Sequence, residues 1–234
     1  MPNSTATASA GIMQFPRAFK VKTIAANGAK IHVRVGGKGP PAVLLHGFGE
    51  TGDMWAPLAA ELVHGHTVIV PDLRGMGLSS RPAAGYDKKT QGEDIAGVLD
   101  ALKVGKVDLV THDIGNMVGY AFAAEHPDRV AKFVLMDAPL PGIGPWEDLI
   151  RSHKVWHFSF YGPDAERLVK GRERIYLDRF WNEFSYDPKN SVRHCAGITP
   201  NFTLGQAPCM RLSSNSKLSI RIRPITRRSS PKAS

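Results

Sequence analysis

Short apolar runs and amphipathic stretches alternate along residues 19–136 of the chain. The apolar runs have the length and composition of buried strands, and the stretches between them place apolar residues on one face of a helix. Asn27-Gly28 separates the first two runs and favours a tight hairpin turn. The pattern predicts strands over 19–25, 30–36, 42–45, 67–70, 107–110 and 130–136, and helices over 54–63, 93–102 and 116–125. This order predicts an α/β fold, in which a mostly parallel sheet is flanked by helices on both faces.

The residue pattern changes after Pro141. Aromatic residues concentrate in 146–184, residues 168–184 have helical spacing, and no strand pattern occurs there. We therefore expect a helical insertion that lies over the sheet as a cap. The chain is predicted to divide into a flexible N-terminus (1–14), an α/β core (15–140), a partial helical cap (141–187) and a basic tail (188–234).

The tail carries the whole of the chain's formal net charge of +9. Every Asp and Glu precedes residue 188, and the end of the chain is rich in Ser, Arg, Lys and Pro, a composition typical of disorder. We interpret the tail as the non-native product of a truncated or shifted reading frame. The alternative is an arm that binds nucleic acid. It is disfavoured because no aromatic residue follows Phe202 to stack on bases.

Composition excludes several broad classes of protein. Hydrophobic residues make up 42% of the 234 residues, enough for a folded body, yet no apolar run approaches the ~18 residues of a membrane span. The first ten residues lack the basic start and apolar stretch of a secretory signal. Cys195 and Cys209 have neither disulfide-framework nor zinc spacing. We expect a cytoplasmic protein without metal or cofactor, and the oligomeric state stays open.

Candidate chemistry lies at three predicted strand ends. His46-Gly47, Asp113 and Asp137 each follow an apolar run, and ligands bind beyond the carboxyl ends of parallel strands. Asp113 lies at a sharp strand-to-helix turn, where a nucleophile elbow places its reactive side chain. A carboxylate there suits attack on the saturated carbon of an epoxide or alkyl halide, which gives an ester. The alternatives are that Asp113 only caps the following helix and that Asp137 only occupies a turn.

Several motifs follow one another in a characteristic order: His46-Gly47-Phe48, Asp72-Leu73-Arg74-Gly75-Met76-Gly77, His112-Asp113-Ile114-Gly115, His126-Pro127-Asp128-Arg129 and Trp156-His157-Phe158. By motif order and spacing, residues 15–185 resemble an α/β-hydrolase of the epoxide hydrolase group. The string around His157, with an acid at position 137, is similar to the Cif-type branch of that group. The resemblance implies an α/β-hydrolase fold with a helical cap and a small-molecule epoxide substrate.

The resemblance also implies roles for individual residues. Asp113 would be the nucleophile, and Asp137 the carboxylate that orients the catalytic base. The backbone N–H groups of Phe48 and Ile114 would form the oxyanion hole, which faces the charge that develops when the ester is hydrolysed. His157 would hydrogen-bond the epoxide oxygen, the alternative being an ordinary histidine in an aromatic cluster. The other motif residues would shape the loops: His46, Gly47, His112 and Gly115.

The resemblance also predicts that part of the catalytic machinery is missing. The resemblance calls for a catalytic His in a loop after two more strand–helix units, and nothing after Pro188 has that pattern, so the last strands and helix of the core are expected to be missing. A full-length relative would need roughly 60 or more further residues. We therefore expect impaired turnover or a non-catalytic remnant.

A dehalogenase could use the same Asp113 as its nucleophile. The residue after Asp113 is Ile114 rather than the Trp that often follows the Asp in dehalogenases, which favours an epoxide substrate over a halide.

Overall fold

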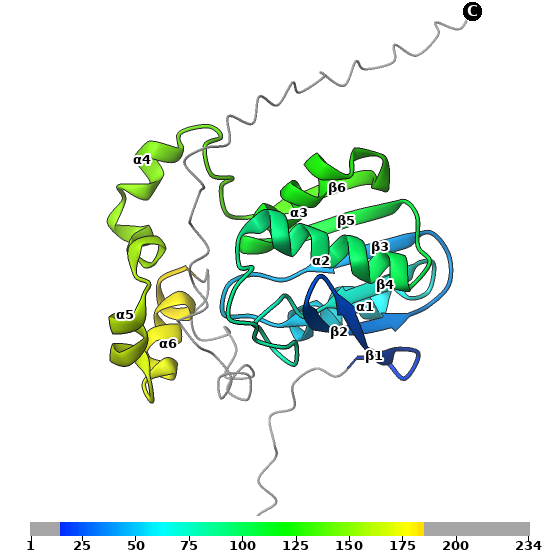
Figure 1. The fold of residues 1–234 in the computed structure, drawn as a ribbon, viewed down its shortest axis with the longest axis horizontal. Coiled ribbons are helices and arrows are strands. Elements are labelled where there is room, and N and C mark those ends of the chain that lie inside the picture. Colours follow the sequence, from blue (N-terminus) through cyan, green and yellow to red (C-terminus); the bar gives the residue numbers. More distant parts are fainter. Residues whose placement is uncertain (1–14, 185–234) are drawn as a thin grey trace, which may run out of the picture.

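The strands form one six-stranded sheet in the order β1-β2-β4-β3-β5-β6 (Figure 1). The structure is a computed structural model and describes residues 15–184. Strands β4, β3, β5 and β6 run parallel, whereas β1 and β2 are antiparallel to their neighbours. The strands are β1 Lys20–Ala26, β2 Ala29–Gly36, β3 Pro41–Leu45, β4 Thr67–Pro71, β5 Val107–His112 and β6 Val130–Met136. The predicted mostly parallel α/β sheet is confirmed, with each strand within about two residues of its expected bounds.

The hairpin between β1 and β2 has the predicted two-residue turn. Ala26 pairs with Ala29, and the two residues between them, Asn27 and Gly28, have φ values of +43° and +78°. Two consecutive left-handed residues fit the twist of the flanking strands, and Asn-Gly adopts them with little strain. The hairpin sets the register of β2, which then pairs with β4.

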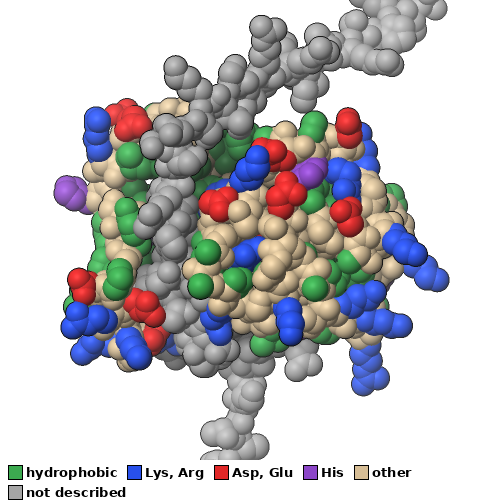
Figure 2. Space-filling model, viewed as in Figure 1, with side chains coloured by type: hydrophobic (Ala, Val, Ile, Leu, Met, Phe, Trp, Pro, Cys, Tyr) green, Lys and Arg blue, Asp and Glu red, His purple; other side chains and the backbone are tan. Residues whose placement is uncertain are grey.

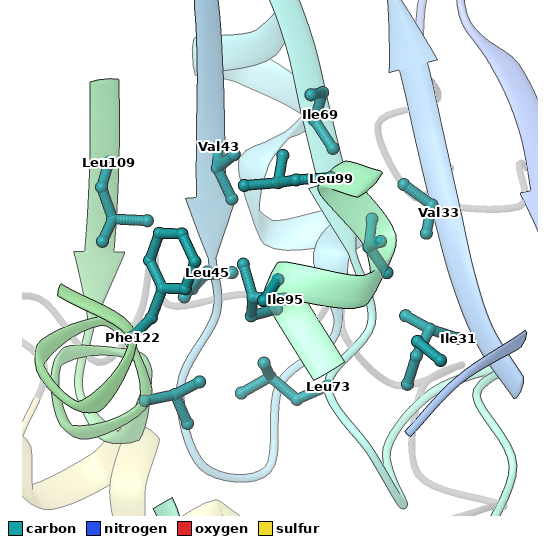
Figure 3. Close-up of a cluster of buried hydrophobic side chains, with 14 of the residues drawn as sticks. Ile31, Val33, Val43, Leu45, Ile69, Leu73, Ile95, Leu99, Leu109 and Phe122 are labelled. Atoms are coloured by element: carbon teal, nitrogen blue, oxygen red, sulfur yellow. The ribbon is translucent and has the colours of Figure 1, made fainter. Parts of the chain in front are cut away.

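Helices cover both faces of the sheet, as the alternating pattern predicts. The main core lies between one face and helices α2 (Lys88–Ala101) and α3 (Ile114–Glu125), where Phe122, Leu99 and Leu109 are fully buried (Figure 3). A smaller core lies under helix α1 (Ala56–Leu62) on the other face, with Leu44, Trp55, Ala59, Val68 and Val70. Burial of these apolar side chains holds the layers together and fixes the strand ends beneath the site.

Some helix boundaries differ from the prediction. Helix α2 begins five residues earlier than expected because the Asp87 side chain accepts a hydrogen bond from the Thr90 N–H at 2.8 Å and so caps a polar first turn. The predicted helix over 54–63 is a short 3-10 segment, Gly52–Trp55, followed by α1. The pattern over 168–184 is split, because Gly171 adopts a left-handed φ of +77°.

The segment after β6 is helical, and no strand occurs between 141 and 184. It contains α4 (Trp146–Ile150), a 3-10 segment (His153–Ser159), α5 (Pro163–Val169) and α6 (Glu173–Phe184). Figure 1 shows these helices beside one end of the sheet. Residues 141–184 are called the cap below. The predicted flexible N-terminus and basic tail lie outside the described residues.

Strand β6 is the edge of the sheet among the described residues. Its apolar side chains Val134 and Leu135 are 47% and 46% exposed. Acidic and basic side chains are mixed over the visible face (Figure 2), in keeping with the neutral charge of the body. Between residues 15 and 184, no helix combines the length and apolarity that a membrane crossing requires.

Candidate active site

Asp113 occupies a strained turn between β5 and α3. Its φ and ψ are +52° and −122°, a backbone conformation that few residues other than glycine adopt. Its side chain makes no capping hydrogen bond to α3. Instead, Oδ1 accepts a hydrogen bond of 2.7 Å from the N–H of Phe48, in the loop after β3. This geometry does not support the alternative in which Asp113 only caps the helix.

Gly115 lets the helix begin close to the end of β3. A Cβ atom at this position would lie 2.5 Å from the carbonyl oxygen of Leu45 and 2.8 Å from that of His46. Both contacts are with backbone atoms, which cannot swing aside as a side chain can. The absence of a side chain at Gly115 therefore brings the elbow and the loop after β3 into contact.

Burial raises the pKa of the Asp113 carboxyl above its ordinary value. The hydrogen bond from the Phe48 N–H, together with the nearby N–H of Ile114, favours the anion and opposes this rise. The same two groups were predicted as the oxyanion hole, and both face the Asp113 carboxylate. The Asp113 carboxylate has therefore lost part of its hydration and is held in one orientation by the Phe48 N–H.

Asp137 lies at the end of β6, in a second unusual turn. Asp137 and Ala138 have φ values of +52° and +53°, and the Asp137 side chain is 82% exposed. The buried side chain of Asn116, on α3, donates hydrogen bonds to the carbonyl oxygens of Met136, Asp137 and Ala138. Asn116 thereby ties the turn that carries Asp137 to the helix that follows Asp113.

His46 is the first residue of the loop after β3, and His112 is the last residue of β5. His46 is fully buried, and its Nε2 accepts a hydrogen bond of 2.9 Å from the N–H of Leu73, so the ring braces backbone. The His112 ring lines the cavity described below, with Nδ1 3.0 Å from Oε2 of Glu50. This hydrogen bond is the main cause that raises the pKa of His112.

Glu50 is a site residue that the sequence analysis did not single out. Its Oε2 also accepts a hydrogen bond of 2.7 Å from the N–H of Gly47. The sequence feature that could have identified Glu50 is its position in the loop of His46-Gly47-Phe48, directly after a predicted strand.

His157 lies in the cap, among aromatic rings. Its ring is stacked on Phe48 and makes edge contacts with the rings of Phe158, Phe180 and Phe184. Desolvation, followed by the nearby positive charge of Arg179, lowers the pKa of His157 to about 4, so the ring is neutral near pH 7. Nδ1 lies 3.4 Å from Nη1 of Arg179, a donor that favours the tautomer protonated at Nε2.

A cavity of about 510 Å³ brings the predicted residues of core and cap together. Its walls include Phe48, His112, Asp113, Asp137 and His157, together with the apolar side chains of Met54, Leu149, Val155, Phe158, Leu177, Phe180 and Phe184. Four other predicted residues do not line the cavity: His46, Gly47, Ile114 and Gly115. His46, Gly47 and Gly115 instead make close contacts with the backbone or side chains of the loops that carry the lining residues. In residues 15–184, no cluster of three His, Cys, Asp or Glu side chains could hold a metal ion.

Comparisons with known proteins agree with the fold. The chain is 34% identical to a soluble epoxide hydrolase of Corynebacterium sp. over 172 residues, which cover 71% of this chain and 60% of that protein. It is 33% identical to a fluoroacetate dehalogenase of Burkholderia sp. over 161 residues, which cover 64% of this chain and 53% of that protein. The chain thus spans less than two thirds of either relative.

Solved structures show the same relationship. Cfl2 from Burkholderia cenocepacia superposes with a TM-score of 0.67 at 32% identity, covering 75% of this chain and 63% of that one. A mutant epoxide hydrolase of Vigna radiata superposes with a TM-score of 0.61 at 29% identity, covering 70% of this chain and 55% of that one. Residues 40–195 match the family described as the alpha/beta hydrolase fold. The chain therefore belongs to the α/β-hydrolase fold family and has epoxide hydrolases and a dehalogenase among its relatives.

Proposed function

We propose that the site opens an epoxide by attack of Asp113 on a ring carbon. The observation that carries this proposal is the Asp113 carboxylate at a positive-φ elbow, held at 2.7 Å by the Phe48 N–H and facing a largely apolar cavity. A half-buried carboxylate that a backbone donor orients suits nucleophilic attack on saturated carbon. The relationship to a soluble epoxide hydrolase supports the same reaction class.

In the proposed first step, Oδ2 of Asp113 forms a bond to an epoxide carbon while Oδ1 stays with the Phe48 N–H. The carbon–oxygen bond of the ring breaks, and its electron pair goes to the epoxide oxygen. The Nε2–H of neutral His157 donates a hydrogen bond to this oxygen, which takes its proton from water. A neutral imidazole stabilises the developing alkoxide without giving up its own proton, so His157 acts here as a hydrogen-bond donor rather than as an acid.

The second step, hydrolysis of the ester, needs a base that activates water. Two imidazoles line the cavity within the described part of the chain. The ring of His112 is hydrogen-bonded to Glu50, and that of His157 faces Arg179. Neither is placed as a free base beside Asp113. We therefore propose that the ester forms on this chain and accumulates.

Mass spectrometry tests this proposal directly. Incubation with a reactive epoxide such as styrene oxide is expected to add one substrate mass to the peptide that carries Asp113. Asp113→Asn is expected to abolish the adduct because an amide is a poor nucleophile, and Asn tolerates the positive φ of the turn. Asp148→Asn, on the exposed surface of α4, is the matched control and should be labelled like the parent.

Two results would contradict this mechanism. Multiple-turnover formation of a diol would mean that a base acts in the chain after all. A folded sample that forms no adduct would mean that the site is a non-catalytic remnant.

Dehalogenation is the second candidate function, because a fluoroacetate dehalogenase is among the relatives and the same carboxylate could displace a halide. Release of fluoride from fluoroacetate, without labelling by the epoxide, would favour it.

A further inference from the structure

Glu50 and His112 form a pair that the proposed reaction does not itself use. Glu50 lies in the loop after β3, and His112 is the last residue of β5. The two elements are adjacent in the sheet, so the side chains meet at the carboxyl ends of their strands. One oxygen of Glu50, Oε2, accepts hydrogen bonds both from the Gly47 N–H at 2.7 Å and from Nδ1 of His112 at 3.0 Å.

This pair is packed directly against the nucleophile. A Cβ atom added to Gly47 would lie 2.7 Å from Cβ of Asp113, 2.7 Å from Oε2 of Glu50 and 2.9 Å from Nδ1 of His112. Gly47 is followed by Phe48, whose N–H holds Oδ1 of Asp113. Two consecutive backbone N–H groups are therefore bound by two different carboxylates. Glu50 holds the first, and Asp113 accepts from the second.

Charge strengthens the pair. The His112 ring faces Glu50 at Nδ1, has Oδ2 of Asp137 4.0 Å from Nε2, and is the neighbour of Asp113 in sequence. These three carboxylates raise the pKa of His112, and burial opposes them. Protonation of the ring makes its hydrogen bond to Glu50 charge-assisted, which is shorter and stronger than a neutral bond.

We infer that Glu50, braced by His112, is a positioning residue for the oxyanion hole. By fixing the Gly47 N–H it sets the orientation of the next peptide group, and thus the distance at which the Phe48 N–H meets Asp113. The inference rests on the proposed function in one respect, the role of Asp113 as nucleophile. The positioning itself can be tested without any substrate.

The test uses the full chain and compares two glutamate–histidine pairs. Glu50→Leu removes the acceptor for the Gly47 N–H, and Glu50→Gln keeps an oxygen that can accept from it. Glu93 provides the matched control, because its Oε1 lies 2.9 Å from Nε2 of His126 and both side chains are exposed to a degree similar to the first pair. Glu93→Leu therefore breaks a comparable pair away from the cavity.

The first readout is the amide proton resonance of Phe48, assigned by ¹⁵N labelling. A short hydrogen bond to a carboxylate shifts this proton downfield. We expect it to move upfield in Glu50→Leu and to stay near its parent position in Glu50→Gln and Glu93→Leu. The second readout is adduct formation with styrene oxide. Its saturating rate is expected to fall about tenfold to a hundredfold in Glu50→Leu, with an unchanged half-saturating concentration, because a displaced donor affects the reacting geometry rather than binding.

The outcomes separate the inference from the proposed function. If the Phe48 resonance moves as expected but the parent forms no adduct, the positioning role stands and the proposed function fails. If the resonance and the rate in Glu50→Leu both equal those of Glu93→Leu, the positioning role is refuted. Should Glu50→Leu fail to fold, His112→Phe removes the brace and leaves Glu50 in place. An unmoved Phe48 resonance in that variant refutes the inference as well.

Discussion

Gly115→Ala tests whether the elbow depends on the close approach of α3 to β3. Gly115 is the second residue of α3, and alanine is a better helix former than glycine by up to about 1 kcal/mol. Helix propensity alone therefore predicts a more stable protein. The tertiary geometry predicts the opposite, because the new Cβ would lie 2.5 Å from the Leu45 carbonyl oxygen.

The magnitude follows from that overlap. Ordinary van der Waals contact requires the helix and the strand end to separate by roughly 1 Å, and overpacking of this kind costs about 1–3 kcal/mol. For a protein of this size, such a loss lowers the melting temperature by roughly 3–10 °C. The displacement also moves Asp113 away from the Phe48 N–H, so labelling by an epoxide should slow in the same variant.

Thermal unfolding followed by circular dichroism is a suitable assay, with Gly105→Ala as the control. A Cβ atom at Gly105 would meet nothing within 4 Å, and its φ is not in the left-handed region, so alanine there should be neutral or stabilising by up to about 1 kcal/mol. Opposite signs for the two variants support the argument. If Gly115→Ala melts at or above the parent temperature, the close approach does not constrain the elbow and the reasoning is wrong.

Three further predictions concern the core, the cap and the sheet edge. Phe122→Ala removes a fully buried ring and should cost about 3–5 kcal/mol in a urea titration, and a loss below 1 kcal/mol would contradict the packing described. The folded state lowers the pKa of His157 from 6.5 to about 4, which means that the fold disfavours the charged ring. The free energy of unfolding should therefore fall as the pH drops from 6.5 to 4, by at most about 3 kcal/mol before solvent screening. Acid titrations of the unfolding midpoint should show this dependence in the parent and not in His157→Gln. The exposed apolar side chains of β6 should promote self-association through the strand edge, so Leu135→Lys should shift light scattering towards the monomer, whereas a parent protein that is already monomeric would argue against this.

The sequence predicted the sheet well because its strands are short, continuous apolar runs whose ends are marked by Gly, Pro or a polar residue. It placed Asp113 and Asp137 at strand ends, and the structure puts both on the wall of one cavity. Helix boundaries were less predictable. The first turn of α2 is polar and depends on a cap at Asp87, and the break between α5 and α6 depends on the backbone of Gly171.

Residues that act through long-range side-chain contacts escaped the sequence analysis. Glu50 meets His112 only because β3 and β5 are neighbours in the sheet, and that pairing is not visible in the local pattern of either segment. Arg179 belongs to a helix whose spacing was recognised, but its contact with His157 depends on how that helix packs against the 3-10 segment. Neither contact produces a periodicity or a motif.

Hydrogen bonds from the core hold Asp113 and the turn that carries Asp137. The Asp113 carboxylate is held by the Phe48 N–H of the loop after β3, and the turn of Asp137 is held by Asn116 of α3. The cap contributes several of the cavity walls, among them His157. Sequence change in the cap can therefore reshape what the cavity accepts while the separation and orientation of the acids stay fixed. In evolutionary terms, the shape of the cavity and the placement of the two acids depend on different segments and can change independently.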